Sequence, residues 1–235
     1  MQLTVRAVSK LFEVPEKTIY RWIEQEDLPA SRIDGQYGFN RGELVEWATA
    51  HHVPVPDKIF QGTDNDVGAL PSLTGALQAG GIFHGLKGAD KASVLRAVVE
   101  AMPLPQQADR HLLLQMLLAR ESLQSTGVGE GIAIPHVRNP VVLQVPRPMI
   151  TLCFLEPPVD FGALDNRPVF ALFSLVSPSP RVHLHLLSRI AFALRDAGFK
   201  EAIAGRGTQE KILSAAHQVE VNLQSRSRGT SGKER

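Results

Sequence analysis

His136 is the residue of this chain that is best placed for chemistry on an anionic group. It follows a glycine-rich run, residues 127–131 (GVGEG), and a short apolar segment, residues 132–134 (IAI). Imidazole is nucleophilic when neutral and titrates at about pH 6.5, so it can both attack and release a group at cellular pH. We therefore interpret His136 as a nucleophile at the end of a short strand.

The segment before His136 is interpreted as a cradle for an anion. Alternating glycines disfavour a helix and let backbone amides turn toward one point. The hydroxyl groups of neighbouring side chains can add further donors. The predicted cradle consists of Ser125, Thr126, Gly127 and Gly129.

Two more side chains are expected to meet His136. Arg120 is predicted to end the preceding helix, and its guanidinium matches phosphate oxygens in bidentate geometry. His183 lies in the first turn of a helix opened by prolines, where unpaired amides and the helix dipole favour an anion. It would either hold the tautomer of His136 or donate a hydrogen bond to a transferred group. His185 lies two residues away and faces elsewhere, so this pair predicts no metal site.

Helices on both sides of this run must position the candidate side chains. Asp90 caps a predicted helix over residues 90–101, whose apolar residues share one face, and a second helix is predicted over residues 108–120. A third helix is predicted within residues 177–194, after the two prolines of SPSP.

Residues 117–136, LLARESLQSTGVGEGIAIPH, resemble the active-site signature of phosphotransferase-system enzyme IIA domains of the nitrogen-regulatory, fructose and mannitol type. The similarity continues in residues 159–194, VDFGALDNRPVFALFSLVSPSPRVHLHLLSRIAFAL, and covers residues 73–220 as a whole. The sequence departs from the commonest pattern after the histidine, where Val137 and Arg138 stand and a glycine is frequent. This departure bears on partner specificity.

The resemblance implies a fold, a reaction and a partner. The fold would be α/β, a mixed β-sheet flanked by helices, as in mannitol-type enzyme IIA. His136 would be the phosphorylated histidine and would receive its phosphoryl group from a phosphocarrier protein of the HPr type. His183 and Arg120 would occupy the places of the family's second active-site histidine and its active-site arginine.

The composition indicates a soluble globular protein. Of 235 residues, 43% are hydrophobic and 21% are charged, and the net charge of +1 gives no general attraction to nucleic acid or membrane. No apolar run approaches the ~20 residues that span a bilayer, and the opening residues lack the apolar core of a signal peptide. Cys153 is the only cysteine, which excludes an internal disulfide. These features predict a cytoplasmic protein without cofactor, metal or membrane association.

Four parts follow one another along the chain. Residues 1–52 are predicted to form a helix-turn-helix domain, residues 53–72 a linker, residues 73–220 the enzyme IIA-like domain, and residues 221–235 a disordered basic tail. The linker holds three prolines and a polar stretch without helical or alternating apolar pattern. After Val221 the tail has one apolar residue and four basic ones.

Residues 3–50 indicate a small, mainly helical module with a hairpin. Thr4 caps a first helix, a turn at residues 14–15 precedes a second helix over residues 16–25, and Asn40 caps a third. The hairpin, residues 32–39, turns at Asp34-Gly35 and forms a wing. The module resembles winged helix-turn-helix domains of the excisionase and MerR type, which lay the second helix in the major groove. The resemblance implies DNA contacts by Lys17, Thr18, Tyr20, Arg21, Arg32 and Gln36.

The charge of this module leaves its partner open. Through Asn40 it carries five basic and six acidic side chains, a net charge of −1, whereas strong DNA binders have a clear basic excess. The alternatives are a surface for another protein and a weak DNA binder that needs to dimerise.

Three functional hypotheses remain. The first is a regulatory phosphocarrier, in which phosphorylation of His136 alters the binding of DNA or of a regulated partner protein by the N-terminal module. The second is a DNA- or protein-binding regulator that keeps the fold and relays no phosphate. The third is a sugar-pathway component that passes its phosphoryl group to a separate IIB protein.

Overall fold

The computed structural model describes residues 3–33, 35–51, 53–56, 59, 70–137 and 145–230. The chain forms two compact units, Met1–Asp66 and Val67–Arg235, and the division falls within the segment predicted as a linker. Part of that segment is nevertheless folded. Ile59 is fully buried, and its carbonyl accepts a hydrogen bond from Arg41 Nη1 at 2.6 Å. The described start of the predicted linker therefore packs onto the first unit.

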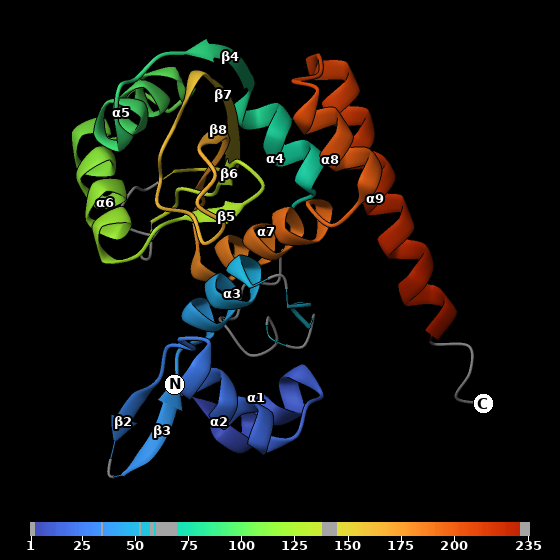
Figure 1. The fold of residues 1–235 in the computed structure, drawn as a ribbon. Helices are drawn as coiled ribbons and strands as arrows, with labels where there is room; N and C mark the ends of the chain where they lie inside the picture. Colours follow the sequence, from blue (N-terminus) through green and yellow to red (C-terminus); the bar gives the residue numbers. More distant parts are fainter. Residues whose placement is uncertain are drawn as a thin grey trace. The chain divides into compact units, whose positions relative to one another are not determined.

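The first unit is a helix-turn-helix module with a hairpin (Figure 1). Its elements are β1 (Leu3–Thr4), α1 (Val5–Phe12), α2 (Glu16–Gln25), β2 (Ser31–Ile33), β3 (Gln36–Phe39) and α3 (Arg41–Ala50), with strand order β1-β3-β2. Thr4 accepts a hydrogen bond from the Ala7 amide and Asn40 from the Gly42 amide, which confirms both predicted caps. Asp34, predicted at the tip of the wing, lies outside the described residues.

Aromatic packing holds the helices of this module together. The rings of Trp22 and Trp47 lie 4.9 Å apart, and Trp47 Nε1 donates to the Glu26 carbonyl at 2.7 Å. Both indoles are buried. These tryptophans therefore belong to the core, and α2 keeps its other face for solvent.

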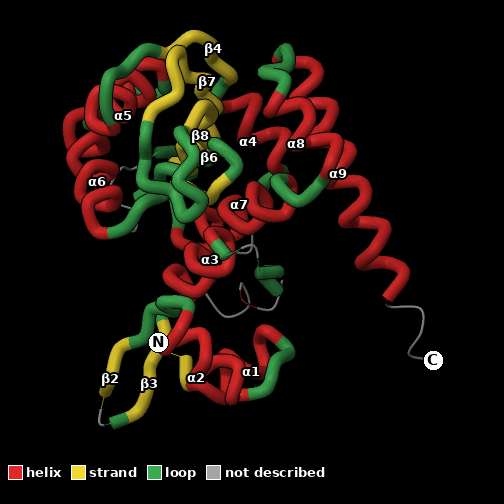
Figure 2. The backbone as a smooth tube through the Cα atoms, viewed as in Figure 1, coloured by secondary structure: helices red, strands yellow, loops and turns green. Residues whose placement is uncertain are grey.

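The second unit is a mixed sheet between helices (Figure 2). Its elements are α4 (Leu73–Gly80), β4 (Ile82–Leu86), α5 (Lys91–Ala101), α6 (Arg110–Leu123), β5 (Gly127–Gly129), β6 (Ile132–Ala133), β7 (Met149–Val159), β8 (Val169–Val176), α7 (Pro180–Ala193), α8 (Ala197–Ala204) and α9 (Gln209–Thr230). The strand order is β4-β7-β8-β6-β5, with β4 parallel to β7, β6 parallel to β8 and the other pairs antiparallel. Figure 1 shows α5 and α6 on one side of the sheet and α4, α8 and α9 on the other. The expected α/β fold is present.

Burial on both faces explains the apolar central strands. Of the eleven residues of β7 the first seven are buried, and all but one of the residues of β8 are. Leu95 and Val99 of α5 pack with Leu113 and Leu117 of α6 in a cluster that includes Met149 at the start of β7. The packed central strands thus support the β5–β6 hairpin, which lies at one edge of the sheet.

Two helices end later than predicted. The helix that carries Arg120 continues to Leu123, so Arg120 does not end it. Helix α9 continues through Thr230, whereas the sequence predicts a disordered tail from residue 221. The Ser225 hydroxyl bonds the Val221 carbonyl at 3.0 Å, and residues 221–228 contain no glycine or proline to stop the helix. Residues 231–235 lie outside the described part. Among the described residues, no helix has the length and apolar character needed to cross a bilayer.

Candidate active site

His136 stands beside the central strand β8. It forms an isolated parallel bridge with Leu175, and the Leu175 amide donates to the Pro135 carbonyl at 3.1 Å. The Nδ1 atom of His136 lies 2.7 Å from the Ile134 carbonyl oxygen. A carbonyl can only accept a hydrogen bond, so Nδ1 is the donor in this contact, and a neutral ring with this tautomer has its lone pair on Nε2. His136 is 3% exposed.

His183 faces His136 from the first turn of α7. Ser179 caps this helix, and Pro180 occupies its first turn. The two imidazole rings have their centroids 5.3 Å apart at an interplanar angle of 47°. The structure therefore brings together the two histidines that the sequence singles out.

Ser177 is a site residue that the sequence analysis missed. It follows β8 directly and is fully buried, and its Oγ lies 3.3 Å from His183 Nδ1. The contact engages Nδ1 of His183 and so constrains the orientation of its ring. A serine directly after a buried strand and six residues before a candidate histidine is the signal that could have found it.

The glycine-rich run, predicted as an anion cradle, forms a hairpin. Gly127 and Gly129 belong to β5, which pairs antiparallel with β6. The predicted donors serve protein acceptors: the Thr126 amide and hydroxyl bind Glu121 Oε2 at 3.0 and 2.6 Å, and the Gly127 amide binds Ser125 Oγ at 3.0 Å. The Ser125 hydroxyl in turn donates to the Phe161 carbonyl at 2.5 Å. In this structure nearby acceptors within the fold take up these donors, and the cradle stays a prediction.

The turn of this hairpin is tied to the loop between β7 and β8. The Glu130 amide donates to Asp165 Oδ2 at 2.7 Å, and this hydrogen bond, with a smaller contribution from the Arg167 amide, lowers the pKa of the Asp165 carboxyl. Gly131 has φ +76°, and a Cβ there would meet the Phe170 ring at 2.6 Å. Glycine is required at this point by both the backbone conformation and the close packing.

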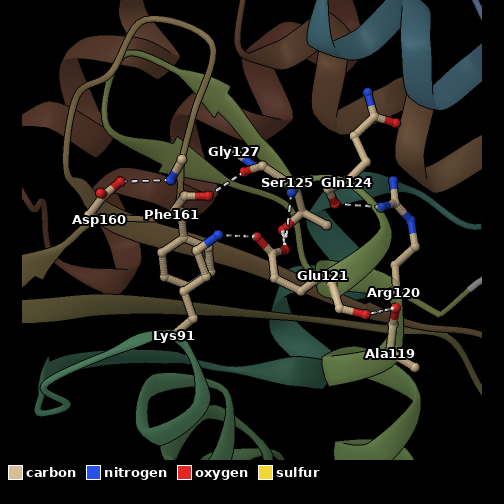
Figure 3. Close-up of polar contacts among 12 residues, drawn as sticks. Lys91, Ala119, Arg120, Glu121, Gln124, Ser125, Gly127, Asp160 and Phe161 are labelled. Atoms are coloured by element: carbon tan, nitrogen blue, oxygen red, sulfur yellow. Dashed lines mark hydrogen bonds and ion pairs between the residues drawn. The ribbon is translucent and has the colours of Figure 1, made fainter.

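Arg120 and Glu121 lie next to the hairpin, near the end of α6 (Figure 3). Arg120 is buried, and its Nη1 donates to the Gln124 carbonyl at 2.8 Å. The guanidinium is thus held at the C-terminal end of α6, just before Ser125. Glu121 is a buried carboxylate that the sequence analysis also missed, and it accepts both donors of Thr126.

The predicted DNA-contacting residues lie on α2 and the wing. Lys17, Tyr20, Arg21, Arg32 and Gln36 are exposed, and Thr18 is half-buried. Tyr37, which the sequence analysis did not select, joins the two elements: its ring lies 6.0 Å from the Tyr20 ring and 5.0 Å from the Arg32 guanidinium carbon. Arg21 is engaged by Glu26 at 3.7 Å. Helix and wing therefore present one continuous polar and aromatic surface.

Comparison with known families decides the relationship of the C-terminal unit. Residues 76–218 match the family described as "Phosphoenolpyruvate-dependent sugar phosphotransferase system, EIIA 2". The chain belongs to this EIIA family. Residues 3–52 match a helix-turn-helix domain family, so the chain joins a helix-turn-helix module to an EIIA domain.

Similar proteins include regulatory and sugar-specific members of the EIIA family. A nitrogen regulatory protein of Pseudomonas aeruginosa is 38% identical over 141 residues, which cover 58% of this chain and 86% of that protein. The fructose-specific EIIABC component of Bacillus subtilis is 30% identical over 112 residues, or 47% of this chain and 17% of that protein. The crystal structure of the nitrogen regulatory protein IIA-Ntr of Neisseria meningitidis aligns with a TM-score of 0.51 at 26% identity, covering 57% of this chain and 92% of that one.

Proposed function

We propose that this EIIA protein is a regulatory phosphocarrier that accepts a phosphoryl group on Nε2 of His136. The observation that carries the proposal is the 2.7 Å contact between His136 Nδ1 and the Ile134 carbonyl, which leaves the Nε2 lone pair as the nucleophile. The same contact persists after transfer when Nδ1 keeps its proton: the phosphorylated ring of His136 is then an imidazolium, and the donor, protonated on its other ring nitrogen, leaves as a neutral imidazole. A stable N–H donor then holds the ring in one orientation in both states.

The donor in this proposal is the phosphohistidine of an HPr-type protein. The Nε2 lone pair of His136 attacks phosphorus in line, the new N–P bond forms, and the donor's P–N bond breaks with its electron pair returning to the donor imidazole. His183 lies close enough to contribute charge or a hydrogen bond to the transferred group, and Arg120 is assigned to its oxygens. Because His136 is 3% exposed, a donor reaches Nε2 only after groups around the ring move aside.

The regulatory assignment draws on the whole chain. The relative from Pseudomonas aeruginosa is named a nitrogen regulatory protein, and the present chain adds a helix-turn-helix module to the EIIA domain. We assign that module to DNA, through Lys17, Thr18, Tyr20, Arg21, Arg32 and Gln36. A phosphoryl group adds nearly two negative charges, enough to change the contacts of a neighbouring domain or a regulated partner protein. A cytoplasmic location remains part of the same proposal.

Phosphoryl transfer tests the proposal directly. The purified protein is incubated with phosphoenolpyruvate, enzyme I and an HPr-type carrier, and intact mass is recorded for the parent, His136→Ala and, as matched control, His111→Ala. His111 is an exposed histidine on α6. A single acid-labile phosphoryl group on the parent and on His111→Ala, absent from His136→Ala, is expected. Labelling of His136→Ala at the parent's level would refute the site.

A second assay tests the coupling to DNA. Duplexes selected from a random pool are titrated with phosphorylated and unphosphorylated protein at fixed salt, since affinity for DNA depends strongly on salt concentration. A difference of at least several-fold between the two forms is expected. Equal DNA affinity, together with equal binding of partner proteins, would remove the regulatory part of the proposal and leave the phosphocarrier intact.

One relative favours a second candidate, transfer to a IIB protein. The Bacillus subtilis relative is a fructose-specific component that carries EIIA with B and C parts, as its name states. If this chain serves a sugar pathway, labelled protein should pass its phosphoryl group to a purified fructose-type IIB domain. Retention of the label in the presence of several IIB domains would exclude this candidate.

A further inference from the structure

We propose that Glu121 is a positioning residue for His136. In this proposal the buried carboxylate holds the start of the glycine hairpin, and the hairpin holds the Ile134 carbonyl that selects the tautomer of His136. The proposal rests on the function proposed for His136, since the purpose of the arrangement is to keep the Nε2 lone pair available. Glu121 would act through the backbone and touch neither substrate nor the reacting atoms.

The carboxylate of Glu121 is held from two sides (Figure 3). The residue is 7% exposed, and its Oε2 accepts hydrogen bonds from both the amide and the hydroxyl of Thr126. Lys91 Nζ, at the start of α5, lies 3.4 Å from Oε1 and also 5.9 Å from the centre of the Phe161 ring. Hydrogen bonds to a charged acceptor are shorter and stronger than neutral ones, so Thr126 is fixed on both its backbone and its side chain.

Two hydrogen bonds connect Thr126 to the imidazole. The Ile134 amide donates to the Thr126 carbonyl at 2.9 Å, and the Ile134 carbonyl accepts from His136 Nδ1 at 2.7 Å. Thr126 and Ile134 directly flank the pairing of β5 with β6, in which Gly127 lies opposite Ala133. A displacement of Thr126 is therefore passed to Ile134 and from there to the acceptor of His136.

The identity of the buried group supports a positional role. Burying a carboxylate is costly unless it is paired and hydrogen-bonded, and an apolar residue would fill the same space without that cost. Here the charge is matched by one lysine and two donors from a single threonine. Within the described residues, Glu121 Oε1 is engaged by the Lys91 ion pair and by no hydrogen bond, so the positioning is carried by Oε2 and the two donors of Thr126.

Three variants separate position from charge. Glu121→Gln keeps an oxygen that can accept both Thr126 donors, because both bind the same carboxylate oxygen, and removes the charge. Glu121→Ala removes the acceptor altogether. Glu130→Gln is the matched control, since Glu130 is exposed at the tip of the same hairpin and its carboxylate pairs with Lys200. All three are studied in the full-length protein.

Two readouts are needed. Long-range ¹H–¹⁵N NMR of the imidazole of His136 reports which ring nitrogen is protonated, with no phosphoryl donor present. The rate of phosphoryl acceptance from the HPr-type carrier reports the consequence for transfer. We expect Glu121→Ala to lose the single Nδ1–H tautomer and to accept the group roughly 100-fold more slowly, while Glu121→Gln keeps the tautomer and stays within a few-fold of the parent. Glu130→Gln should match the parent in both.

The outcomes distinguish this proposal from the proposed function. A folded Glu121→Ala protein with the parent's tautomer and rate would overturn the positioning role, as would an equal loss of rate in both Glu121 variants with the tautomer unchanged. If Glu121→Ala does not fold, Glu121→Met fills similar space and removes the acceptor of both Thr126 donors, and an unchanged tautomer and rate in that variant would overturn the role. If the parent protein accepts no phosphoryl group, the proposed function fails, and the NMR comparison still decides what orients His136.

Discussion

Replacing Gly80 with alanine should destabilise the EIIA domain, because α4 meets β7 at this residue without room for a side chain. A Cβ on Gly80 would lie 2.2 Å from the Ile150 carbonyl oxygen and 2.7 Å from the Thr151 amide nitrogen. Ordinary contacts begin at 3.4 Å, so the end of α4 must move away from β7 by about 1.2 Å.

The cost of this movement follows from the contacts it breaks. Thr151 Oγ1 donates to the Gly80 carbonyl at 3.0 Å and the Leu152 amide to the Gly81 carbonyl at 3.0 Å, and both would lengthen beyond hydrogen-bond range. Each bond contributes about 1 kcal/mol net, and overpacking adds about 1–3 kcal/mol. The better helix propensity of alanine offsets about 1 kcal/mol. The free energy of unfolding should therefore fall by about 2–4 kcal/mol.

Denaturant unfolding can measure this change in the EIIA domain separately. Trp22 and Trp47 are the only tryptophans and both belong to the first unit, so indole fluorescence follows that unit while far-UV circular dichroism follows mainly the larger one. We expect Gly80→Ala to lower the dichroism midpoint and leave the fluorescence midpoint in place.

A glycine with a much milder contact provides the control. Gly198 of α8 would place a Cβ 3.3 Å from Asp196 Oδ1, only slightly inside the ordinary range, so Gly198→Ala should change the free energy of unfolding by at most about 1 kcal/mol. A dichroism midpoint of Gly80→Ala equal to that of the parent would refute the steric reasoning.

Three further perturbations follow from individual contacts. Burial raises the pKa of Cys153 to about 12, so a thiol reagent at pH 8 should label unfolded but not native protein, and rapid labelling of native protein would contradict this. Because the folded pKa lies above the ordinary value of 9.0, any stability from the protonated thiol is lost as the pH rises from 9 toward 12. Ser177→Ala removes the 3.3 Å contact to His183 Nδ1 and should slow phosphoryl acceptance by about tenfold in the transfer assay, whereas an unchanged rate would show that Ser177 does not orient His183. Arg32→Gln should weaken DNA binding and reduce the slope of log affinity against log salt by about 1, and an unchanged slope would place Arg32 outside the phosphate contacts.

Local signals in the sequence were enough to predict most helices. The caps at Thr4, Asn40 and Asp90 depend on a side chain that bonds an amide two or three residues later, so the pattern and the structure are set by the same few residues. The turn before α2 and the hairpin of the wing are equally local. The pairing of His136 with His183, 47 residues apart, is predicted from the chemistry of a histidine at a helix start and from the resemblance to enzyme IIA domains, because no local pattern connects the two segments.

What the sequence could not determine depends on contacts between distant segments. The glycine run alone is compatible with an open cradle, and only the folded chain shows that Glu121 and Phe161 take up the donors of Thr126 and Ser125. The buried position of Ser177 beside His183 depends likewise on how β8 meets α7.

The sequence by itself therefore predicted the two modules, most of the helices with several of their caps, and the candidate nucleophile, because periodicity and capping act within a few residues. Only the tertiary structure places the Ile134 carbonyl 2.7 Å from Nδ1 of His136. The same fold brings the Glu121 carboxylate of α6 to the start of the hairpin, where it accepts from the Thr126 amide. Hydrogen bonds between distant segments leave no periodic pattern in the sequence. Their donors and acceptors find each other only when the chain packs.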